Sequence, residues 1–239
     1  ELAMVDMLSG GRLIVLFLRG TPNEHQTYDT DAAATRAMTQ EGIDLIVKAW
    51  TSDQPFAWDG EQYHFGTVSV WPKTVQIPHP PIFGSGNSDE SVCFAAARRM
   101  GIAFSFAPPE VVRNWVKLYH AEATKAGWQP GPEHVIYRGI AYAAESDAKA
   151  FDDMGAFFGA KMAEQAHVQQ KTLGGPPVVP LVLEPYFVGG PETLKGKMEA
   201  IRDCGVGVVD LAWGIGRPDQ REQAMECFAK GVLGVAKGL

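Results

Sequence analysis

Short apolar strands alternate with amphipathic helices along almost the whole of this chain. Strands are predicted at 13–18, 81–85, 102–105, 134–141 and 206–212. A segment with helical periodicity follows each of them, so the pattern predicts five strand–helix pairs. The strand at 13–18 is apolar without alternation, which is typical of strands buried on both faces of a parallel sheet. The sequence therefore predicts an α/β fold, either doubly wound or closed as a (β/α)8 barrel.

Other segments depart from this alternation. The aromatic-rich segment 56–65 predicts a β-hairpin with Asp59 and Gly60 as a two-residue turn. A Gly/Pro-rich segment, 173–185, follows the longest helical pattern, and its composition suits a lid-like insertion. Residues 21–30 predict a loop. The chain opens within a helical pattern and without a methionine, so we expect that its natural start lies further upstream.

The composition is that of a globular protein with a full core, because 46% of the residues are hydrophobic and 21% are charged. The net charge of -7 argues against nucleic acid as a partner. Apolar runs are too short for a membrane span. The three cysteines have no CxxC spacing and the six histidines no HxxxH spacing. We therefore predict no metal site and no disulfide, and we expect the protein in the cytoplasm.

Residues 81–91 contain the pattern that most directly suggests a ligand site. A short strand opens into Gly86 and Asn87, and Ser88 is a favoured N-cap for the helix that follows. The first free N–H groups of that helix, its positive dipole end and the hydroxyls of Ser88 and Ser91 would face one point, as in a phosphate site. The alternative is an ordinary strand-to-helix connection with a serine cap.

In either architecture, the carboxyl ends of the strands form one edge that carries the chemistry. We therefore expect Arg19, 85–91, Phe106 and 213–217 to share one rim. Arg19 offers a planar fork of donors that suits a phosphate, and the alternative role for it is a structural salt bridge. The helix start at 189–193 is a weaker candidate for a second anion site.

Several segments resemble, in the same order, the bacterial luciferase-like family of flavin-dependent monooxygenases, also called LLM class flavin-dependent oxidoreductases. They are 1–13, 18–24 together with Arg36, 58–63, 70–81, 85–91 together with 95–97, and 187–193. The resemblance covers nearly the whole chain. It implies a TIM (β/α)8 barrel of which about five C-terminal units, the fourth to the eighth strand, are present.

The same resemblance implies one domain over 1–239 that lacks its N-terminal part. Removing the first strands would expose two strand edges, so we expect the chain to fold poorly on its own. Catalytic residues are not predicted, because in the family they come partly from those first strands. The segment 171–187 corresponds to the place where the family carries a mobile insertion.

For cofactor binding, the resemblance implies that the phosphate of FMN lies at Ser88 and Ser91 with the adjacent backbone of Gly86 and Asn87, and that Arg19 pairs with it. Leu18 would lie near the isoalloxazine ring, and loop residues 23, 24 and 28 would lie close by. The implied reaction uses reduced FMN and molecular oxygen to oxygenate a small organic, hydrophobic substrate. A separate NAD(P)H flavin reductase would supply the reduced flavin, and we expect a homodimer or higher homo-oligomer.

Two alternatives remain open at this stage. One is an F420-dependent dehydrogenase on the same barrel, in which a hydride moves and oxygen takes no part. The other is a non-catalytic flavin-binding homologue. Retention of Arg19, Ser88 and Ser91 together argues against the second alternative, since barrel stability does not require all three.

Overall fold

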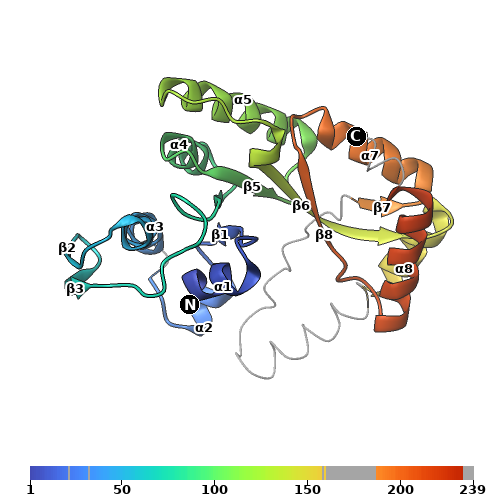
Figure 1. The fold of residues 1–239 in the computed structure, drawn as a ribbon. Coiled ribbons are helices and arrows are strands. Elements are labelled where there is room, and N and C mark those ends of the chain that lie inside the picture. The colour runs from blue at the N-terminus through green and yellow to red at the C-terminus, as the bar shows by residue number, and fades with distance from the viewer. Residues whose placement is uncertain (21, 32, 158, 160–186, 234–239) are drawn as a thin grey trace. The chain divides into compact units, whose positions relative to one another are not determined.

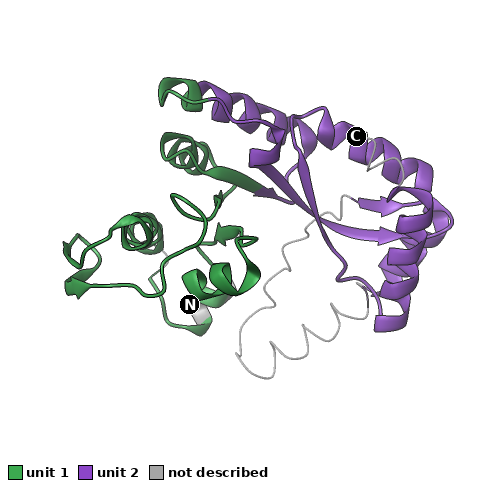
Figure 2. Cartoon of the chain, in the orientation of Figure 1, with its two compact units in different colours: residues 1–103, 122–128 green, residues 104–121, 129–239 purple. Residues whose placement is uncertain are grey.

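The computed structural model describes residues 1–20, 22–31, 33–157, 159 and 187–233 (Figure 1). The chain divides into two compact units. Unit 1 contains residues 1–103 and 122–128, and unit 2 contains residues 104–121 and 129–239 (Figure 2). The predicted insertion at 173–185 lies outside the described residues, as does most of the segment 171–187. The expectation of a single domain over 1–239 stays a prediction.

Unit 1 is built on a parallel sheet in which β4 lies between β1 and β5. Phe17 of β1 is in register with Gly84 of β4, and Ser85 of β4 is in register with Ala103 of β5. The elements of this unit are α1 Leu2–Ser9, β1 Val15–Phe17, α2 Pro22–Thr27, α3 Thr35–Thr51, β2 Phe56–Asp59, β3 His64–Val68, β4 Ile82–Ser85, α4 Asp89–Ala97 and the first part of β5 Gly101–Ser105. The β4 strand is buried at Ile82, Phe83 and Gly84, as its uninterrupted apolar sequence predicts.

Unit 2 also contains parallel strands covered by helices. Its central strand, β6, pairs in parallel with β7 and with β8. The elements are most of α5 Pro109–Lys125, η1 Pro132–His134, β6 Val135–Ala143, a helix described over 147–157, β7 Phe187–Gly189, α7 Pro191–Arg202, β8 Val208–Ala212 and α8 Pro218–Gly231. Tyr137 is fully buried, donates to the carbonyl of Ala107 and packs edge to face against Phe187. The chain is therefore an α/β protein with parallel strands, as predicted.

One predicted loop is partly helical, and one strand was not predicted. The segment 21–30 contains the short helix α2 and is not all loop. The strand β7 was not predicted, because Phe187–Gly189 gives only three apolar or small residues before a helix start. A strand of three residues is too short to show a period, so only its pairing with β6 defines it.

The hairpin of β2 and β3 is held to α3 by one carboxylate. Glu41 accepts hydrogen bonds from the indole of Trp58 (2.9 Å) and from the backbone N–H groups of Gln62 (2.8 Å) and Tyr63 (3.0 Å). Asp59 pairs with His64, and the backbone N–H of Gly60 donates to the carbonyl of Tyr63 at 3.0 Å, so the chain reverses at 61–62 and the predicted turn at Asp59 and Gly60 is wrong in position. A Cβ on Gly60 would lie 1.9 Å from a Glu41 oxygen, which explains the glycine.

We predict that Glu41→Gln loosens this hairpin without unfolding the protein. The hydrogen bond from Trp58, with those from Gln62 and Tyr63, holds the pKa of Glu41 below its usual range. An amide cannot accept all three bonds, since one of its two polar atoms is a donor. Amide hydrogen exchange at Gln62 and Tyr63 should therefore accelerate by about tenfold or more.

The matched control is Glu61→Gln, a carboxylate lost from the same loop. It should leave the exchange of both amides and the fluorescence of Trp58 unchanged. Equal exchange rates in Glu41→Gln and in the parent protein would show that the hairpin is held by other contacts.

Candidate anion-binding site

The N-terminus of α4 follows directly on the end of β4. Ser88 is the N-cap, with extended backbone angles (φ −154°, ψ 152°), and its Oγ accepts from the backbone N–H of Ser91 at 3.3 Å. The two hydroxyl oxygens of Ser88 and Ser91 lie 3.0 Å apart. A Cβ on Gly86 would lie 2.3 Å from the Ser91 Oγ, so a glycine is needed for Ser91 to sit over the turn. Two hydroxyls are therefore gathered at the positive end of the helix.

A second wall of the site comes from α3. Arg36, Thr39, Gln40 and Ile43 follow the i, i+3, i+4, i+7 spacing, so they share one face of the helix. All four line one pocket. Its other lining residues come from β1, from the connection just after β1, and from β4 and α4: Phe17, Arg19, Gly84, Ser85, Ser91 and Phe94. Every lining residue belongs to unit 1. The lining combines the apolar residues Phe17, Ile43 and Phe94 with two arginines and with residues that carry hydroxyls.

The electrostatics of the pocket depend on Arg36, Arg19 and Glu90. The Arg36 Nη1 lies 3.5 Å from the Ser91 Oγ and 3.3 Å from a carboxylate oxygen of Glu90. The Arg36 side chain keeps 31% of its exposure, while that of Glu90 keeps 62%. Among the described residues, no carboxylate lies within ion-pair distance of Arg19, so the salt-bridge alternative finds no partner there. The pocket is thus lined by two positive groups, one of which, Arg36, pairs with an exposed carboxylate.

The structure brings together most of the residues predicted for the cofactor phosphate. Arg19 and Ser91 line the same pocket, Ser88 is bonded to Ser91, and Gly86 lies beneath the Ser91 side chain. Asn87 lies in the turn between them and is exposed. The assignment of these five residues to a cofactor is a proposal, since the structure contains no ligand contact that tests it.

Sequence reasoning missed Arg36, Thr39 and Gln40 as pocket residues. Arg36 was noted only as part of the family-like sequence. The helical spacing that predicts this helix starts at Ile43 and runs toward its C-terminal end, where the residues on that face are apolar. Continued in the other direction, the same stripe reaches Gln40, Thr39 and Arg36 and changes from apolar to polar. That change at the N-terminal end of a helix was the available signal.

Other predicted rim residues have different environments. Leu18 lies between the pocket residues Phe17 and Arg19 in the sequence. It does not line the pocket, and its side chain is 65% exposed. Tyr28 is also exposed, at 76%, and the side chain of residue 23 lies outside the described part of the chain. Phe106 has a left-handed backbone conformation (φ 59°) and belongs to unit 2, like 213–217.

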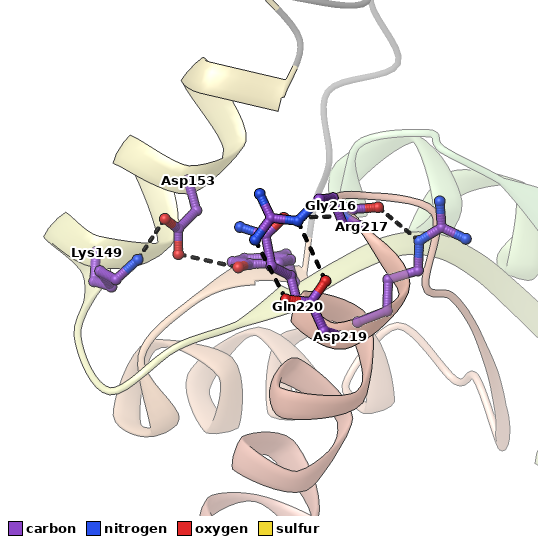
Figure 3. A network of polar contacts seen from close by, with 8 residues as sticks. Lys149, Asp153, Gly216, Arg217, Asp219 and Gln220 are labelled. Atoms are coloured by element: carbon purple, nitrogen blue, oxygen red, sulfur yellow. Dashed lines mark hydrogen bonds and ion pairs between the residues drawn. The ribbon is translucent and has the colours of Figure 1, made fainter.

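The polar residues after β8 make local contacts. Arg217 pairs with Asp219, and its backbone N–H donates to the side-chain oxygen of Gln220, which caps α8 (Figure 3). In the same view, Asp153 contacts Lys149 and accepts from the phenol of Tyr142 at 3.0 Å. Burial, together with this hydrogen bond, raises the pKa of Tyr142 to about 12. The contacts of Arg217 cap α8, and those of Asp153 tie the helix over 147–157 to β6, so both serve the stability of unit 2.

A protein side chain already occupies the N-terminus of α7. The Asp147 carboxylate accepts from the backbone N–H of Gly190 at 2.7 Å and from the hydroxyl of Thr193 at 2.8 Å. These bonds hold the pKa of Asp147 below its usual range. The weaker candidate for a second anion site at 189–193 therefore already holds an anion supplied by the chain.

Within the described part of the chain, no cluster of three or more His, Cys, Asp or Glu residues is arranged to hold a metal ion. None of the described helices has the length and apolar character needed to cross a membrane.

The fold and the pocket together define an α/β protein with parallel strands and a polar pocket, lined by two arginines and two serines, that follows strand ends. The chain belongs to the luciferase-like monooxygenase family, whose model matches residues 1–207. The family expected from the sequence is thereby confirmed.

Two curated relatives match part of the chain. An uncharacterized protein, y4wF, from Sinorhizobium fredii is 27% identical over 123 residues, which are 51% of this chain and 35% of the relative. The FMNH(2)-dependent dimethylsulfone monooxygenase of Pseudomonas putida is 32% identical over 94 residues, 37% of this chain and 25% of that enzyme. The matches thus span about a third or less of either relative.

Solved structures match over almost the whole chain. The monooxygenase RslO1 from Streptomyces bottropensis has a TM-score of 0.77 and 26% identity, covering 98% of this chain and 72% of that one. An F420-dependent secondary alcohol dehydrogenase has a TM-score of 0.76 and 16% identity, covering 98% of this chain and 73% of that one. The second likeness shows the fold alone. The fold therefore matches luciferase-like TIM barrels, while the number of barrel units stays a prediction.

Proposed function

We propose that this chain is part of a flavin-dependent monooxygenase that uses reduced FMN and molecular oxygen to oxygenate a small organic substrate. The observation that carries the proposal is the pocket in which Arg19 and Arg36 face Ser91 at the N-terminus of α4. Membership of the luciferase-like family supports an oxidoreductase activity. The partial match to an FMNH(2)-dependent enzyme supports FMN as the cofactor.

The residues of the pocket fit a phosphate group. The hydroxyls of Ser88 and Ser91 and the free N–H groups of the first turn of α4 would donate to its oxygens. The guanidinium groups of Arg19 and Arg36 would neutralise its charge, and a guanidinium can form two parallel hydrogen bonds to one phosphate. Gly86 and Asn87 would approach it through their backbone. The flavin supplies the oxidation chemistry when it is bound, and these residues fix where it lies.

The aliphatic and aromatic pocket residues have a separate task in this proposal. Phe17, Ile43 and Phe94 exclude water from one side of the phosphate, which strengthens its hydrogen bonds to the surrounding donors. Leu18 lies next to this wall in sequence and carries a large exposed apolar side chain. We propose that it contacts the ring system of the cofactor, and that the substrate is a small hydrophobic compound that binds beyond it. We place the reaction in the cytoplasm, in a homo-oligomer supplied with reduced flavin by a separate reductase.

The test is cofactor binding by the full-length natural protein, measured by flavin fluorescence quenching with FMN and riboflavin. FMN should bind about 100-fold more tightly than riboflavin, because only FMN carries the phosphate. Oxygen consumption with reduced FMN and candidate substrates then tests the monooxygenase assignment. Binding of F420 with anaerobic substrate oxidation would replace it by a dehydrogenase. Equal affinity for FMN and riboflavin would remove the phosphate site from the proposal.

A further inference from the structure

Glu90 is placed where a bound phosphate would need room and positive charge. It lies in the first turn of α4, one residue before Ser91, and its carboxylate is 3.3 Å from the Arg36 Nη1. The same nitrogen is 3.5 Å from the Ser91 Oγ. One guanidinium nitrogen is thus directed at both a carboxylate of the chain and a hydroxyl of the proposed phosphate site.

We propose that Glu90 is a displaceable counterion that holds Arg36 in place when the pocket is free and gives it up to a phosphate dianion. This inference rests on the proposed function, because it assumes that a phosphate group binds between Arg36 and Ser91. It adds that the Glu90 carboxylate competes with the phosphate for Arg36 and so lowers the affinity for the phosphate.

The exposure of the two partners supports displacement. The Glu90 side chain is 62% exposed, so its carboxylate is solvated whenever it leaves Arg36, and the exchange carries only a small penalty. The Arg36 side chain is about half as exposed, at 31%, and lines the pocket from the first turn of α3. The arginine is therefore the fixed partner, and the glutamate is the one that moves.

The competition between Glu90 and a phosphate for Arg36 should affect which anions the pocket prefers. Arg19 and Arg36 contribute two positive charges, and Glu90 contributes one negative charge. With Glu90 in place, the pocket carries one net positive charge, which matches a phosphodiester monoanion. With Glu90 displaced it carries two, which match a phosphate monoester dianion. Glu90 therefore weakens binding of the dianion and narrows its advantage over a monoanion.

The experiment compares Glu90→Gln with the parent full-length protein in binding FMN and riboflavin. The variant should bind FMN about three- to tenfold more tightly, because Arg36 then carries no competing carboxylate. Riboflavin affinity should not change, since it has no phosphate. The gain should shrink at high ionic strength, because the competing pair is exposed. Glu199→Gln, which removes one charge from α7 in unit 2, is the matched control and should leave FMN affinity unchanged.

A double-mutant cycle separates this inference from the proposed function. In an Arg36→Gln background, Glu90→Gln should no longer raise FMN affinity, since the pair is already broken. Unchanged or weaker FMN binding by Glu90→Gln, with FMN still favoured over riboflavin, would overturn the counterion role alone. If FMN is not favoured over riboflavin in the parent protein, the phosphate site itself fails. Glu90→Asp is a second variant, because the shorter side chain should also release Arg36 and tighten FMN binding.

Discussion

Replacing Arg36 by glutamine should weaken FMN binding by the full-length protein by about 10- to 100-fold. Arg36 supplies one of the two cationic groups of the pocket and is directed at the Ser91 hydroxyl by its position on α3. Glutamine keeps a hydrogen-bond donor but loses the charge and the fork of donors. The FMN affinity of Arg36→Lys should lie between those of the parent protein and Arg36→Gln, since lysine keeps the charge but concentrates it on one ammonium group. Isothermal titration of the apoprotein with FMN measures the loss directly.

Riboflavin distinguishes this effect from general damage to the pocket. Its affinity should change by less than about twofold in Arg36→Gln, because it has no phosphate for Arg36 to hold. Arg12→Gln is the control for net charge, since Arg12 is exposed at the end of α1 and away from the lining of the pocket. A parallel loss of FMN and riboflavin affinity would mean that Arg36 shapes the fold of the pocket and does not bind a phosphate.

The contrast between Arg19 and Arg36 shows what could be predicted from the sequence. Arg19 follows an apolar strand, and in a parallel sheet the ends of strands meet at one edge, so its location could be derived from chain order alone. Ser88 is recognisable in the same way, because an N-cap is a property of four or five consecutive residues. Both predictions depend on short stretches of chain.

The position of Arg36 depends on how α3 is rotated about its axis. Its partner Ser91 is 55 residues away in the sequence. The two meet because α3 buries its own residues Ile43 and Trp50, and this burial sets the rotation of the helix. The same limit applies to the hairpin turn. Asp59-Gly60 favours a two-residue turn locally, but the contacts of Glu41 with Gln62 and Tyr63 hold the turn further along the chain, at 61–62. Tertiary contacts outweigh local preference at both places.

Asp6 makes a second long-range contact, on which we expect unit 1 to depend strongly. It is fully buried in α1 and accepts three hydrogen bonds, from the backbone N–H groups of Val75 (2.8 Å) and Gln76 (3.0 Å) and from the Gln76 side chain (2.7 Å). The Gln76 amide also donates to the carbonyl of Leu13, just before β1. One carboxylate therefore ties together α1, the approach to β1 and the segment that precedes β4.

Asp6→Asn should lower the melting temperature of the full-length protein at pH 7 by about 5 °C or more. An amide would turn one donor toward N–H groups that need an acceptor, and at least one of them would stay buried without a partner. Asp6→Ala should have the larger effect, because all three donors lose their acceptor. Asp53→Asn, a change at an exposed aspartate of unit 1, should leave the melting temperature unchanged. Differential scanning calorimetry gives the comparison.

The pH dependence identifies charge as the cause. Burial by itself raises the pKa of Asp6, but the hydrogen bonds from Gln76 and Val75 outweigh it, so the pKa is below its usual value. A carboxyl with a lowered pKa stabilises the fold fully above its unfolded pKa, near 4, and this contribution is lost as the pH falls through the folded value. The difference in melting temperature between the parent and Asp6→Asn should therefore be constant from about pH 6 to 7 and shrink below about pH 4. If the difference in melting temperature is the same at pH 3 as at pH 7, the ionised carboxylate is not what holds α1 to the segment before β4, and the packing of the side chain is.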